Sequence, residues 1–493
     1  MLDNFILGFS QLLYWQVPVA IVVGAALGII CGAMPGLSGT TGVALMIPFT
    51  YGLSPMPSMA LLVSLYTASE YGGSISAITV NIPGAPAAVM STVDGYPLTQ
   101  KGRTGQALAI SIVSSTFGGF FSTILLILFS IPLARVAIAF GPAEFFGLGV
   151  FGLSIVAGLA GKNWLKAILA GLIGLLIKTM GADPLTGNMR FTFGWTGLYD
   201  GVAFIPVMLG LFAISEVFFI IEEGVTSRLA KGMTLSKERI CWREIRGLWK
   251  CMVRSSAIGT AVGIVPGAGA GIGSIISYNE ARRFSKSPDE FGKGSVEGLC
   301  ASETANNATV GGALVPLLTL GVPGSGATAV LIGAFMLHNI NPGPLLFVNH
   351  PDIVYGIFIC LFLANIAMLA YGMLGIRLWL KVAQVSPAIL APLIFGVAII
   401  GSYGIGSSSS DVIIMIASGM MAYILRKLKF PLLPMVIALV LGYMVEISLR
   451  RALLVSHGDP LIFLKSPISL GFLLLAVLSI TWTIIRSERS LQK

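Results

Sequence analysis

Two stretches far apart in the chain share a Gly/Pro pattern. Residues 28–36 read Gly-Ile-Ile-Cys-Gly-Ala-Met-Pro-Gly and residues 259–267 read Gly-Thr-Ala-Val-Gly-Ile-Val-Pro-Gly, so four Gly/Pro positions coincide at an offset of 231 (259 minus 28). A second block repeats at an offset of 240, in which Gly72, Thr79, Pro83 and Gly84 correspond to Gly312, Thr319, Pro323 and Gly324. The change of offset fits an insertion in the polar stretch 280–297. The chain is therefore predicted to contain two related halves.

The composition is that of a membrane protein. Of 493 residues, 55% are hydrophobic and only 10% are charged, whereas soluble domains carry roughly 25% charged residues. Runs without Asp, Glu, Lys, Arg or His cover residues 4–69, 104–134, 304–337, 353–376, 382–410 and 466–485. Each is long enough to cross a bilayer, which takes about 20 apolar residues. These runs lack the alternation of a membrane β-barrel, so they are predicted to be helices, and the chain an all-α polytopic membrane protein.

Several other classes of protein and site have no support in the sequence. Five cysteines show no CxxC spacing and three histidines show no metal-ligand spacing, so neither disulfides nor a metal site is expected. The glycines of 267–273 do not form GxGxxG, and GxxxxGK[ST] is absent, so nucleotide binding is not predicted. The N-terminus has no Lys or Arg before the first apolar stretch, so no cleaved signal peptide is expected.

The net charge of +9 does not indicate nucleic-acid binding. Its densest part is residues 225–254, with eight Lys/Arg against two Glu. In a membrane protein such a segment marks a cytoplasmic loop. The N-terminus has no comparable basic segment, so the two halves are predicted to be inverted relative to each other, as in many secondary transporters. The basic residues Arg486, Arg489 and Lys493 near the C-terminus also suggest that this end is cytoplasmic. Arg450 and Arg451 do not fit an orientation assigned by counting basic residues in this way.

The apolar runs predict about 10 to 12 transmembrane helices. The expected spans are 17–34, 107–131, 136–160, 164–180, 200–221, 255–276, 353–376, 386–405, 411–425, 432–449 and 467–485. The stretches 37–100 and 300–348 are crowded with Gly, Pro, Ser, Thr and Asn and are not expected to be plain spanning helices. We predict a first transmembrane repeat at 1–224, a basic cytoplasmic linker at 225–254, and a second repeat with the C-terminal helices at 255–493.

The Pro-Gly pairs are predicted to break helices. Proline removes a backbone hydrogen bond and clashes with the preceding turn, and glycine permits conformations closed to other residues. The pairs at 35–36 and 266–267 are expected to break spans, and those at 83–84 and 323–324 to form the tips of two re-entrant hairpins. Such backbone survives at membrane depth only inside protein or facing water. Free N–H groups at the broken ends suit a carboxylate substrate.

The candidate substrate-binding residues lie at these breaks or carry nearby hydroxyl and amide groups. They are Pro35, Gly36, Leu37, Ser38, Gly39, Thr40, Ser74, Asn81, Pro83, Gly84, Ala85, Pro266, Gly267, Ala268, Asn306, Asn307, Pro323, Gly324 and Ser325. Glycines at four-residue spacing (24, 28, 32, 36 and 259, 263, 267, 271) are instead expected to allow close helix packing.

Ionisable residues inside apolar segments are functional candidates by default. Four acidic residues qualify, namely Glu70, Asp94, Glu303 and Asp411. Glu303 either binds a coupling cation or caps a helix, and Thr79 and Thr319 join it as ion-coupling candidates. Asp411 follows four serines and is predicted to be a helix N-cap.

Ten motifs are spread over nearly the whole chain. They are Gly32-Ala-Met-Pro-Gly-Leu37, Ala44-Leu-Met-Ile-Pro48, Tyr71-Gly-Gly-Ser74, Asn81-Ile-Pro-Gly84, Asp94-Gly-Tyr-Pro97, Gly263-Ile-Val-Pro-Gly267, Phe291-Gly-Lys-Gly294, Glu303-Thr-Ala-Asn-Asn307, Leu320-Gly-Val-Pro-Gly324 and Asn341-Pro-Gly-Pro344. Together they resemble the large membrane subunit of tripartite tricarboxylate transporters. The segment 67–71 departs from the resemblance, because a glycine-containing segment is expected there.

The resemblance implies a bacterial inner-membrane importer that works with a small membrane subunit and a periplasmic solute-binding protein. It implies uptake of di- or tricarboxylates or related organic acids, driven by a Na⁺ or H⁺ gradient, with no cofactor and no catalytic residue. It leaves open a homodimer of the large subunit. We expect an elevator-type secondary transporter, in which the two breaks and the two hairpin tips form a mobile unit that carries the anion.

Two other functions stay open at this point. The first is a membrane-embedded enzyme acting on a lipid or polar substrate, for which Glu303, Asp94 and His338 would supply the acid and base groups. No helical spacing pairs these residues in the sequence. The second is a passive anion channel, which would conduct without saturation or ion coupling.

Overall fold

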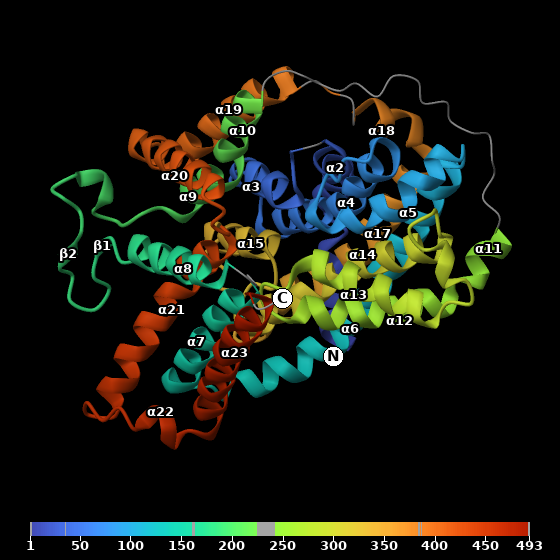
Figure 1. Ribbon diagram of the computed structural model, residues 1–493. Coiled ribbons are helices and arrows are strands. Elements are labelled where there is room, and N and C mark those ends of the chain that lie inside the picture. The colour runs from blue at the N-terminus through green and yellow to red at the C-terminus, as the bar shows by residue number, and fades with distance from the viewer. Residues whose placement is uncertain are drawn as a thin grey trace.

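The computed structural model describes residues 2–34, 36–159, 163–223, 242–382, 385 and 387–491, which form an assembly of helices with one short β-hairpin (Figure 1). The elements before residue 224 are α1 Leu2–Gln11, α2 Gln16–Ala33, α3 Gly39–Thr50, α4 Pro55–Val80, η1 Pro86–Ala88, α5 Val89–Gln100, α6 Thr104–Ala137, α7 Pro142–Leu159, α8 Trp164–Lys178, β1 Gly181–Ala182, β2 Met189–Arg190, η3 Thr196–Leu198, α9 Phe204–Met208, the π-helix η4 Leu209–Ile214 and α10 Ser215–Glu223.

The elements after residue 241 are again helical. They are α11 Trp242–Gly247, α12 Trp249–Ile264, α13 Gly269–Phe284, η5 Pro288–Glu290, α14 Val296–Leu320, α15 Gly326–Leu337, α16 Leu346–Asn349, α17 Pro351–Leu374, α18 Ile376–Val382, α19 Pro387–Gly406, α20 Ser409–Lys427, α21 Leu433–Val455, α22 Ile462–Lys465 and α23 Pro467–Leu491.

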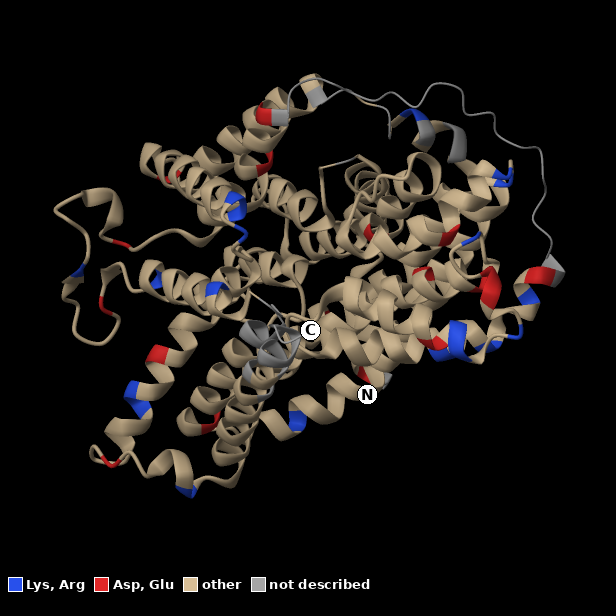
Figure 2. Cartoon of the chain, in the orientation of Figure 1, with Lys and Arg blue, Asp and Glu red and all other residues tan. Residues whose placement is uncertain are grey.

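The chain is a multi-pass membrane protein. Among the described residues, seven helices are long and apolar enough to cross a bilayer: Gln16–Ala33, Thr104–Ala137, Phe204–Glu222, Pro351–Leu374, Ala388–Gly406, Ser409–Lys427 and Leu433–Val455. Four shorter helices are also apolar, and few charged residues interrupt any of these helices (Figure 2). Large apolar side chains on the outer helices are exposed, including Ile400 at 68% and Leu478 at 62%, as expected for side chains that face lipid. The total of 10 to 12 spans stays a prediction.

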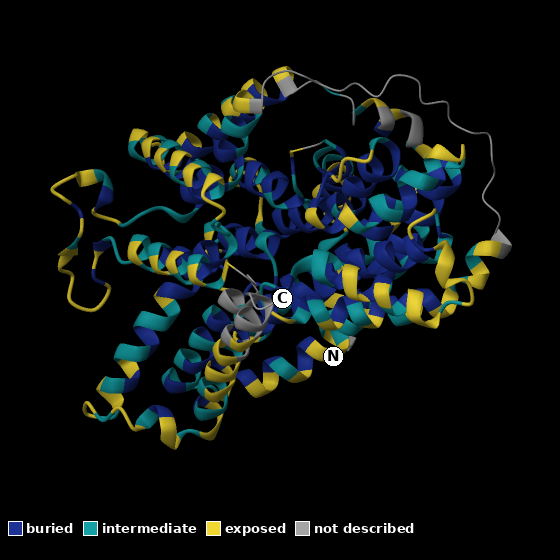
Figure 3. Ribbon diagram, in the orientation of Figure 1, coloured by how far each residue is buried: buried dark blue, intermediate teal, exposed yellow. Residues whose placement is uncertain are grey.

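Helices α4 and α14 form the interior of the protein. In each of them 22 residues are buried, out of 26 in α4 and 25 in α14, and they lie in the dark-blue region of Figure 3. These helices hold many of the small polar residues of the stretches 37–100 and 300–348. They are continuous over lengths that could span a bilayer, which the sequence did not lead us to expect. Their polar side chains are accommodated because other helices, rather than lipid, surround them.

The two halves correspond at the offsets seen in the sequence. α2 ends at Ala33 and α12 at Ile264, which are 231 apart (264 minus 33). α4 ends at Val80 and α14 at Leu320, which are 240 apart (320 minus 80). In both halves a long buried helix therefore follows a helix that is broken at a Pro-Gly pair.

Glycines bring α2 against α4, and α12 against α14, by the same contacts. A Cβ placed at Gly32 would lie 2.2 Å from the carbonyl oxygen of Ser69, and one at Gly263 would lie 2.6 Å from that of Thr309. These two pairs correspond at offsets of 231 and 240. Similar backbone contacts occur at residues 24, 28 and 259. The predicted packing role is confirmed for these five glycines, because any side chain would push the backbones apart. It does not extend to the whole rows: a Cβ at Gly36 would meet the side chain of Glu216, and one at Gly271 would have its nearest neighbour at 3.6 Å.

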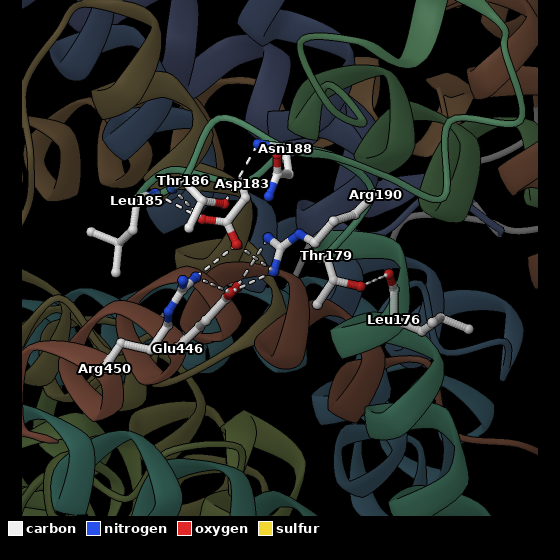
Figure 4. A network of polar contacts seen from close by, with 9 residues as sticks. All are labelled: Leu176, Thr179, Asp183, Leu185, Thr186, Asn188, Arg190, Glu446 and Arg450. Atoms are coloured by element: carbon white, nitrogen blue, oxygen red, sulfur yellow. Dashed lines mark hydrogen bonds and ion pairs between the residues drawn. The ribbon is translucent and has the colours of Figure 1, made fainter. Parts of the chain in front are cut away.

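The hairpin β1–β2 is fastened to α21 by ion pairs (Figure 4). Arg190 Nη1 lies 2.6 Å from Glu446 Oε1 and 3.4 Å from Asp183 Oδ2. Arg450 Nη1 lies 2.8 Å from Asp183 Oδ2 and 3.3 Å from Glu446 Oε1. Arg190 and Arg450 thus share the two carboxylates of Asp183 and Glu446, and this cluster of four side chains carries no net charge.

Two local predictions are corrected by the structure. The boundary expected between spans at 131 and 136 falls inside α6, which contains Pro132 and continues to Ala137. Most of the predicted linker 225–254 lies outside the described residues, and its last residues form the start of α12, which begins at Trp249. The basic residues 250 and 254 stand on this helix rather than in a loop.

The N-cap of α20 is also different from the prediction. Ser408 caps the helix, because its Oγ accepts the backbone N–H of Ser410 at 3.2 Å. Asp411 instead lies in the first turn, where a carboxylate is favoured by the helix dipole. A run of four serines offered several possible caps, and the backbone geometry selects one of them.

Candidate functional site

The first helix break lies between α2 and α3. Met34 leaves the helix with ψ 119°, and Gly36 has φ +89°, which a residue with a side chain rarely adopts. Leu37 is buried, and Ser38 then caps α3 by accepting the backbone N–H of Thr41 on its Oγ at 3.2 Å. Pro35, a predicted site residue, lies outside the described residues. The helix break predicted at this Pro-Gly pair is confirmed.

The second half contains a matching break between α12 and α13. Val265 is extended (ψ 115°), and Gly267, between Pro266 and Ala268, has φ +79°. The N–H of Gly267 donates to the carbonyl oxygen of Gly324 at 3.0 Å. The break is therefore tied directly to the predicted tip that follows α14.

The two predicted tips are the connections after α4 and α14. Asn81 and Gly321 end these helices in the same left-handed conformation, with φ 60° and 71°. Asn81 itself is exposed. Ser325 caps α15 by accepting the N–H of Thr328 at 3.2 Å, and the hydroxyl of Tyr66 lies 3.1 Å from Ser325 Oγ. Whether these connections re-enter a membrane stays a prediction.

The four irregular segments meet one another. Within the first half, a Cβ at Gly84 would lie 2.0 Å from the carbonyl oxygen of Gly32, so this tip packs against the end of α2. Between the halves, a Cβ at Gly326 would lie 3.2 Å from Thr40 Oγ1, which places the starts of α3 and α15 together. A Cβ at Gly271 would lie 3.6 Å from the carbonyl oxygen of Pro86. The first tip thus packs against the end of α2, and the two halves of the chain meet at the starts of α3 and α15 and where Gly271 approaches Pro86.

A cavity of about 560 Å³ opens beside this meeting point. Five predicted residues line it, namely Gly36, Ser38, Pro83, Gly84 and Ala85. The other lining residues are Thr41, Pro86, Leu211, Phe212, Glu216, Arg426, Phe430 and Leu432. The predicted residues of the second half, from 266–268 and 323–325, do not line it. A second cavity of about 500 Å³ reaches Gly321 and the 341–345 segment but none of the predicted substrate-binding residues.

Glu303 lies in the middle of α14 and is completely buried. Its carboxylate accepts hydrogen bonds from Ser91, from Ser111 at 2.8 Å and from Ser115 at 3.2 Å. The helix-cap interpretation of Glu303 is wrong, because Ser295 caps α14 and Glu303 is eight residues further along. The three hydroxyls come from α5 and α6, so Glu303 joins three helices.

Asn306 and Asn307 link α14 to α4. Asn306 Nδ2 donates to the carbonyl oxygen of Glu70 at 3.1 Å, and Asn307 Nδ2 donates to that of Thr67 at 3.1 Å. Within the described part of the chain, the Oδ1 atoms of both amides are buried and accept no hydrogen bond. The segment 67–71, which departs from the expected motif, therefore supplies backbone acceptors to this pair.

The remaining hydroxyl candidates are buried in the helices that precede the tips. Thr79 donates to the carbonyl oxygen of Ile75 at 2.6 Å, and Thr319 donates to that of Val315 at 2.7 Å. The two threonines thus occupy equivalent places in the two halves, and Ser74 is also completely buried. None of the three lines the 560 Å³ cavity.

Asp94 connects two of the sequence motifs. Its Oδ1 accepts the N–H groups of Gly292, Gly294 and Ser295 at 2.8–2.9 Å, and its Oδ2 accepts the hydroxyl of Tyr278 at 2.8 Å. The 94–97 motif therefore holds the loop that contains the 291–294 motif. With four donors bound to this carboxylate, its geometry is that of a structural clamp.

Glu216 and Arg426 are not among the residues predicted from the sequence. Glu216 lies inside the span predicted at 200–221, so an acidic residue in an apolar segment was the signal for it. Arg426 follows an apolar run and begins the cluster 426–429, which has the appearance of an ordinary basic flank. In the structure Arg426 Nη1 and Glu216 Oε2 are 2.8 Å apart. The serines around Glu303 had no recognisable signal in the sequence.

Comparison with known proteins agrees with this architecture. Residues 19–437 match the model of the family described as "Tripartite tricarboxylate transporter TctA family". The chain is 35% identical, over 99% of its own length and 97% of the relative's, to an Agrobacterium vitis protein described as "Uncharacterized 52.8 kDa protein in TAR-I ttuC' 3'region". A second A. vitis protein, "Uncharacterized protein in TAR-II ttuC' 3'region", is 35% identical over 47% of this chain and 96% of its own length. No solved structure shows significant similarity to the chain. Because the family model matches most of its length, the chain belongs to the tripartite tricarboxylate transporter TctA family.

Proposed function

We propose that this transporter subunit is the large membrane component of a binding-protein-dependent secondary transporter. In this proposal it lies in the bacterial inner membrane and imports di- or tricarboxylates or related organic acids. Its partners are a small membrane subunit and a periplasmic solute-binding protein. The observation that carries the proposal is a cavity of about 560 Å³ that is lined by the first helix break and by the tip after α4, next to the point where the starts of α3 and α15 meet. A cavity of this size is in the range that holds small organic ligands.

The cavity offers groups that suit a carboxylate. Ser38 and Thr41, at the start of α3, both line the cavity, and their hydroxyl oxygens lie 3.1 Å apart. Backbone N–H groups at a helix start attract anions without requiring a dedicated charge for each oxygen.

We further infer that the two halves are inverted repeats and that the breaks and tips move as one unit. The support is that the same contacts recur at offsets of 231 and 240. Inverted repeats with broken helices near the substrate are common in secondary transporters. An elevator-type motion would let this unit carry its cargo without separating the contacts at residues 32, 84, 267 and 324.

Glu303, Thr79 and Thr319 remain our candidates for coupling transport to an ion. Among the described residues, the carboxylate of Glu303 accepts hydrogen bonds from three serine hydroxyl groups, so a proton or a cation could be exchanged there. The buried Oδ1 atoms of Asn306 and Asn307 are further oxygen ligands of the kind that hard cations prefer. The candidates for the coupling ion are Na⁺ and H⁺.

Reconstitution tests the proposal. The subunit would be placed in proteoliposomes with its small membrane subunit and its binding protein, and uptake of radiolabelled citrate, succinate and benzoate would be measured under imposed Na⁺ and pH gradients. We expect saturable uptake of at least one acid that stops when the gradient is collapsed. Absence of gradient-dependent uptake for every organic acid tried would reject the proposal.

A pair of serine variants tests the site itself. Ser38→Ala removes a helix cap inside the cavity, whereas Ser408→Ala removes a helix cap outside it. Each loses about 1 kcal/mol of capping energy. Only Ser38→Ala also removes a hydroxyl that, in this proposal, donates a hydrogen bond to the substrate carboxylate. A hydrogen bond to a charged group is worth about 1.5–3 kcal/mol. We expect a KM increase of about tenfold or more for Ser38→Ala and an unchanged KM for Ser408→Ala.

A further inference from the structure

Two oppositely charged side chains face each other in the 560 Å³ cavity. Glu216 comes from α10 and Arg426 from the last turn of α20, 210 residues later (426 minus 216), and both line the cavity. Arg426 Nη1 lies 2.8 Å from Glu216 Oε2 and 3.4 Å from Ser215 Oγ. The guanidinium also stacks over the ring of Phe219, with its Cζ 4.3 Å from the ring centroid. Among the lining residues, Arg426 carries the positive charge and Glu216 the negative charge.

The carboxylate of Glu216 occupies a place that suits a carboxylate ligand. Its Oε2 contacts the guanidinium, while its Oε1 would lie 3.1 Å from a Cβ placed at Gly36. Gly36 is the residue with φ +89° in the break before α3. One oxygen therefore contacts the arginine, and the other lies close to the broken helix before α3.

The pair is set apart from an ordinary surface ion pair. The same two helices are already joined by Glu222 and Lys427, whose side chains are 42% and 46% exposed and do not line the cavity. The side chain of Glu216 is only 16% exposed, and that of Arg426 is 36% exposed. The π-helix η4 directly precedes Ser215, and its Leu211 and Phe212 line the cavity. Such turns occur frequently at functional sites.

We propose that Arg426 binds a carboxylate group of the transported acid and that Glu216 holds Arg426 when no acid is bound. This inference rests on the proposed function and deepens it by naming the cationic residue of the same site. A planar guanidinium can bind a carboxylate through two parallel hydrogen bonds. An acid with two or three carboxylates displaces Glu216, and Glu216 returns when the acid leaves. Arg426 thus always has a carboxylate as its counter-charge.

The proposal predicts opposite effects for the two partners. Arg426→Gln removes the ligand for the acid, so we expect affinity to fall by about tenfold to a hundredfold, as for loss of a hydrogen bond to a charged group. Arg426→Lys keeps the charge without the planar fork and should retain part of the affinity. Glu216→Gln removes the competitor and should strengthen binding about three- to tenfold. A purely structural ion pair predicts instead that both neutral variants have the same effect.

The measurement uses the full-length chain, purified with its small membrane subunit. Dissociation constants for citrate, succinate and benzoate would be measured by isothermal titration, with a thermal melt of each variant to establish that it is folded. Glu222→Gln and Lys427→Gln are the matched controls, because they break an ion pair between the same helices outside the cavity. We expect both controls to bind within about twofold of the unaltered protein, the range for exposed ion pairs.

The outcomes separate this inference from the proposed function. If the unaltered protein binds an acid and folded Arg426→Gln binds it equally well, the role of Arg426 is overturned while the proposed function stands. If Arg426→Gln and Glu216→Gln weaken binding alike, the pair is structural and the inference is again overturned. If the unaltered protein binds none of the organic acids, both proposals are rejected.

Discussion

Replacing Gly32 with alanine tests the close packing that places the first helix break. The added Cβ would lie 2.2 Å from the carbonyl oxygen of Ser69, 2.8 Å from the N of Gly73 and 2.9 Å from the Cα of Gly72. A carbon and an oxygen that are not bonded normally approach to about 3.3 Å. The alanine therefore requires α2 and α4 to separate locally by about 1 Å, and all three neighbouring atoms belong to backbone.

The cost can be estimated from the geometry. Overpacking in a well-packed interior typically costs about 1–3 kcal/mol. For Gly32→Ala we expect about 3 kcal/mol, the upper part of that range, since no flexible side chain can absorb the overlap. At Gly263 the corresponding contact, to Thr309, is longer at 2.6 Å, so Gly263→Ala should cost less, about 2 kcal/mol. The equivalent positions of the two halves should thus respond in the same direction.

The assay is thermal unfolding in detergent, followed by tryptophan fluorescence. Gly32→Ala should melt about 5 °C or more below the unaltered protein. Gly396→Ala is the matched control: this glycine lies inside α19 with no atom within 4 Å of the added Cβ, so alanine should be neutral or stabilise by up to about 1 kcal/mol. Melting of Gly32→Ala within 1 °C of the unaltered protein, or equal damage from Gly396→Ala, would refute the reasoning.

Two further predictions concern acidic residues. Glu303→Gln replaces one carboxylate oxygen with an amide nitrogen, which cannot accept a hydrogen bond either from Ser91 or from Ser111 and Ser115. We expect the variant to be about 1–3 kcal/mol less stable and its uptake to lose the dependence on the ion gradient. Preserved coupling in a folded variant would exclude Glu303 as the coupling residue. Asp183→Asn should loosen the β1–β2 hairpin and speed its cleavage by a protease. Arg450 and the N–H groups of residues 185 and 186 hold the pKa of Asp183 well below its usual range. The stability that the Asp183 carboxylate gives the hairpin is therefore present above about pH 4 and is lost only as the pH falls through the lower pKa of the folded state. A change in the cleavage rate of the unaltered hairpin between about pH 5 and 8 would contradict this.

The sequence determined the places where the helices break. Gly36 and Gly267 adopt positive φ beside their prolines, as the Pro-Gly pairs predicted. This result is local, because a proline removes a hydrogen bond and a glycine relaxes the backbone wherever they occur. The glycine rows also predicted close helix contacts, which need only the absence of a side chain. The offsets of 231 and 240 located both partners of the recurring pairs Gly32–Ser69 and Gly263–Thr309.

Only the tertiary structure decided which polar groups share a site. The hydroxyls around Glu303 come from two other helices, and Arg426 meets Glu216 across 210 residues of sequence (426 minus 216). Residues that are separated so far carry no periodicity that pairs them, and a Lys/Arg cluster after an apolar run looks the same whether it flanks the membrane or lines a cavity. Their pairing depends on how whole helices pack, which many weak contacts set together. The sequence by itself determined the broken helices, and helix packing decided that the first break lies beside an arginine and a glutamate.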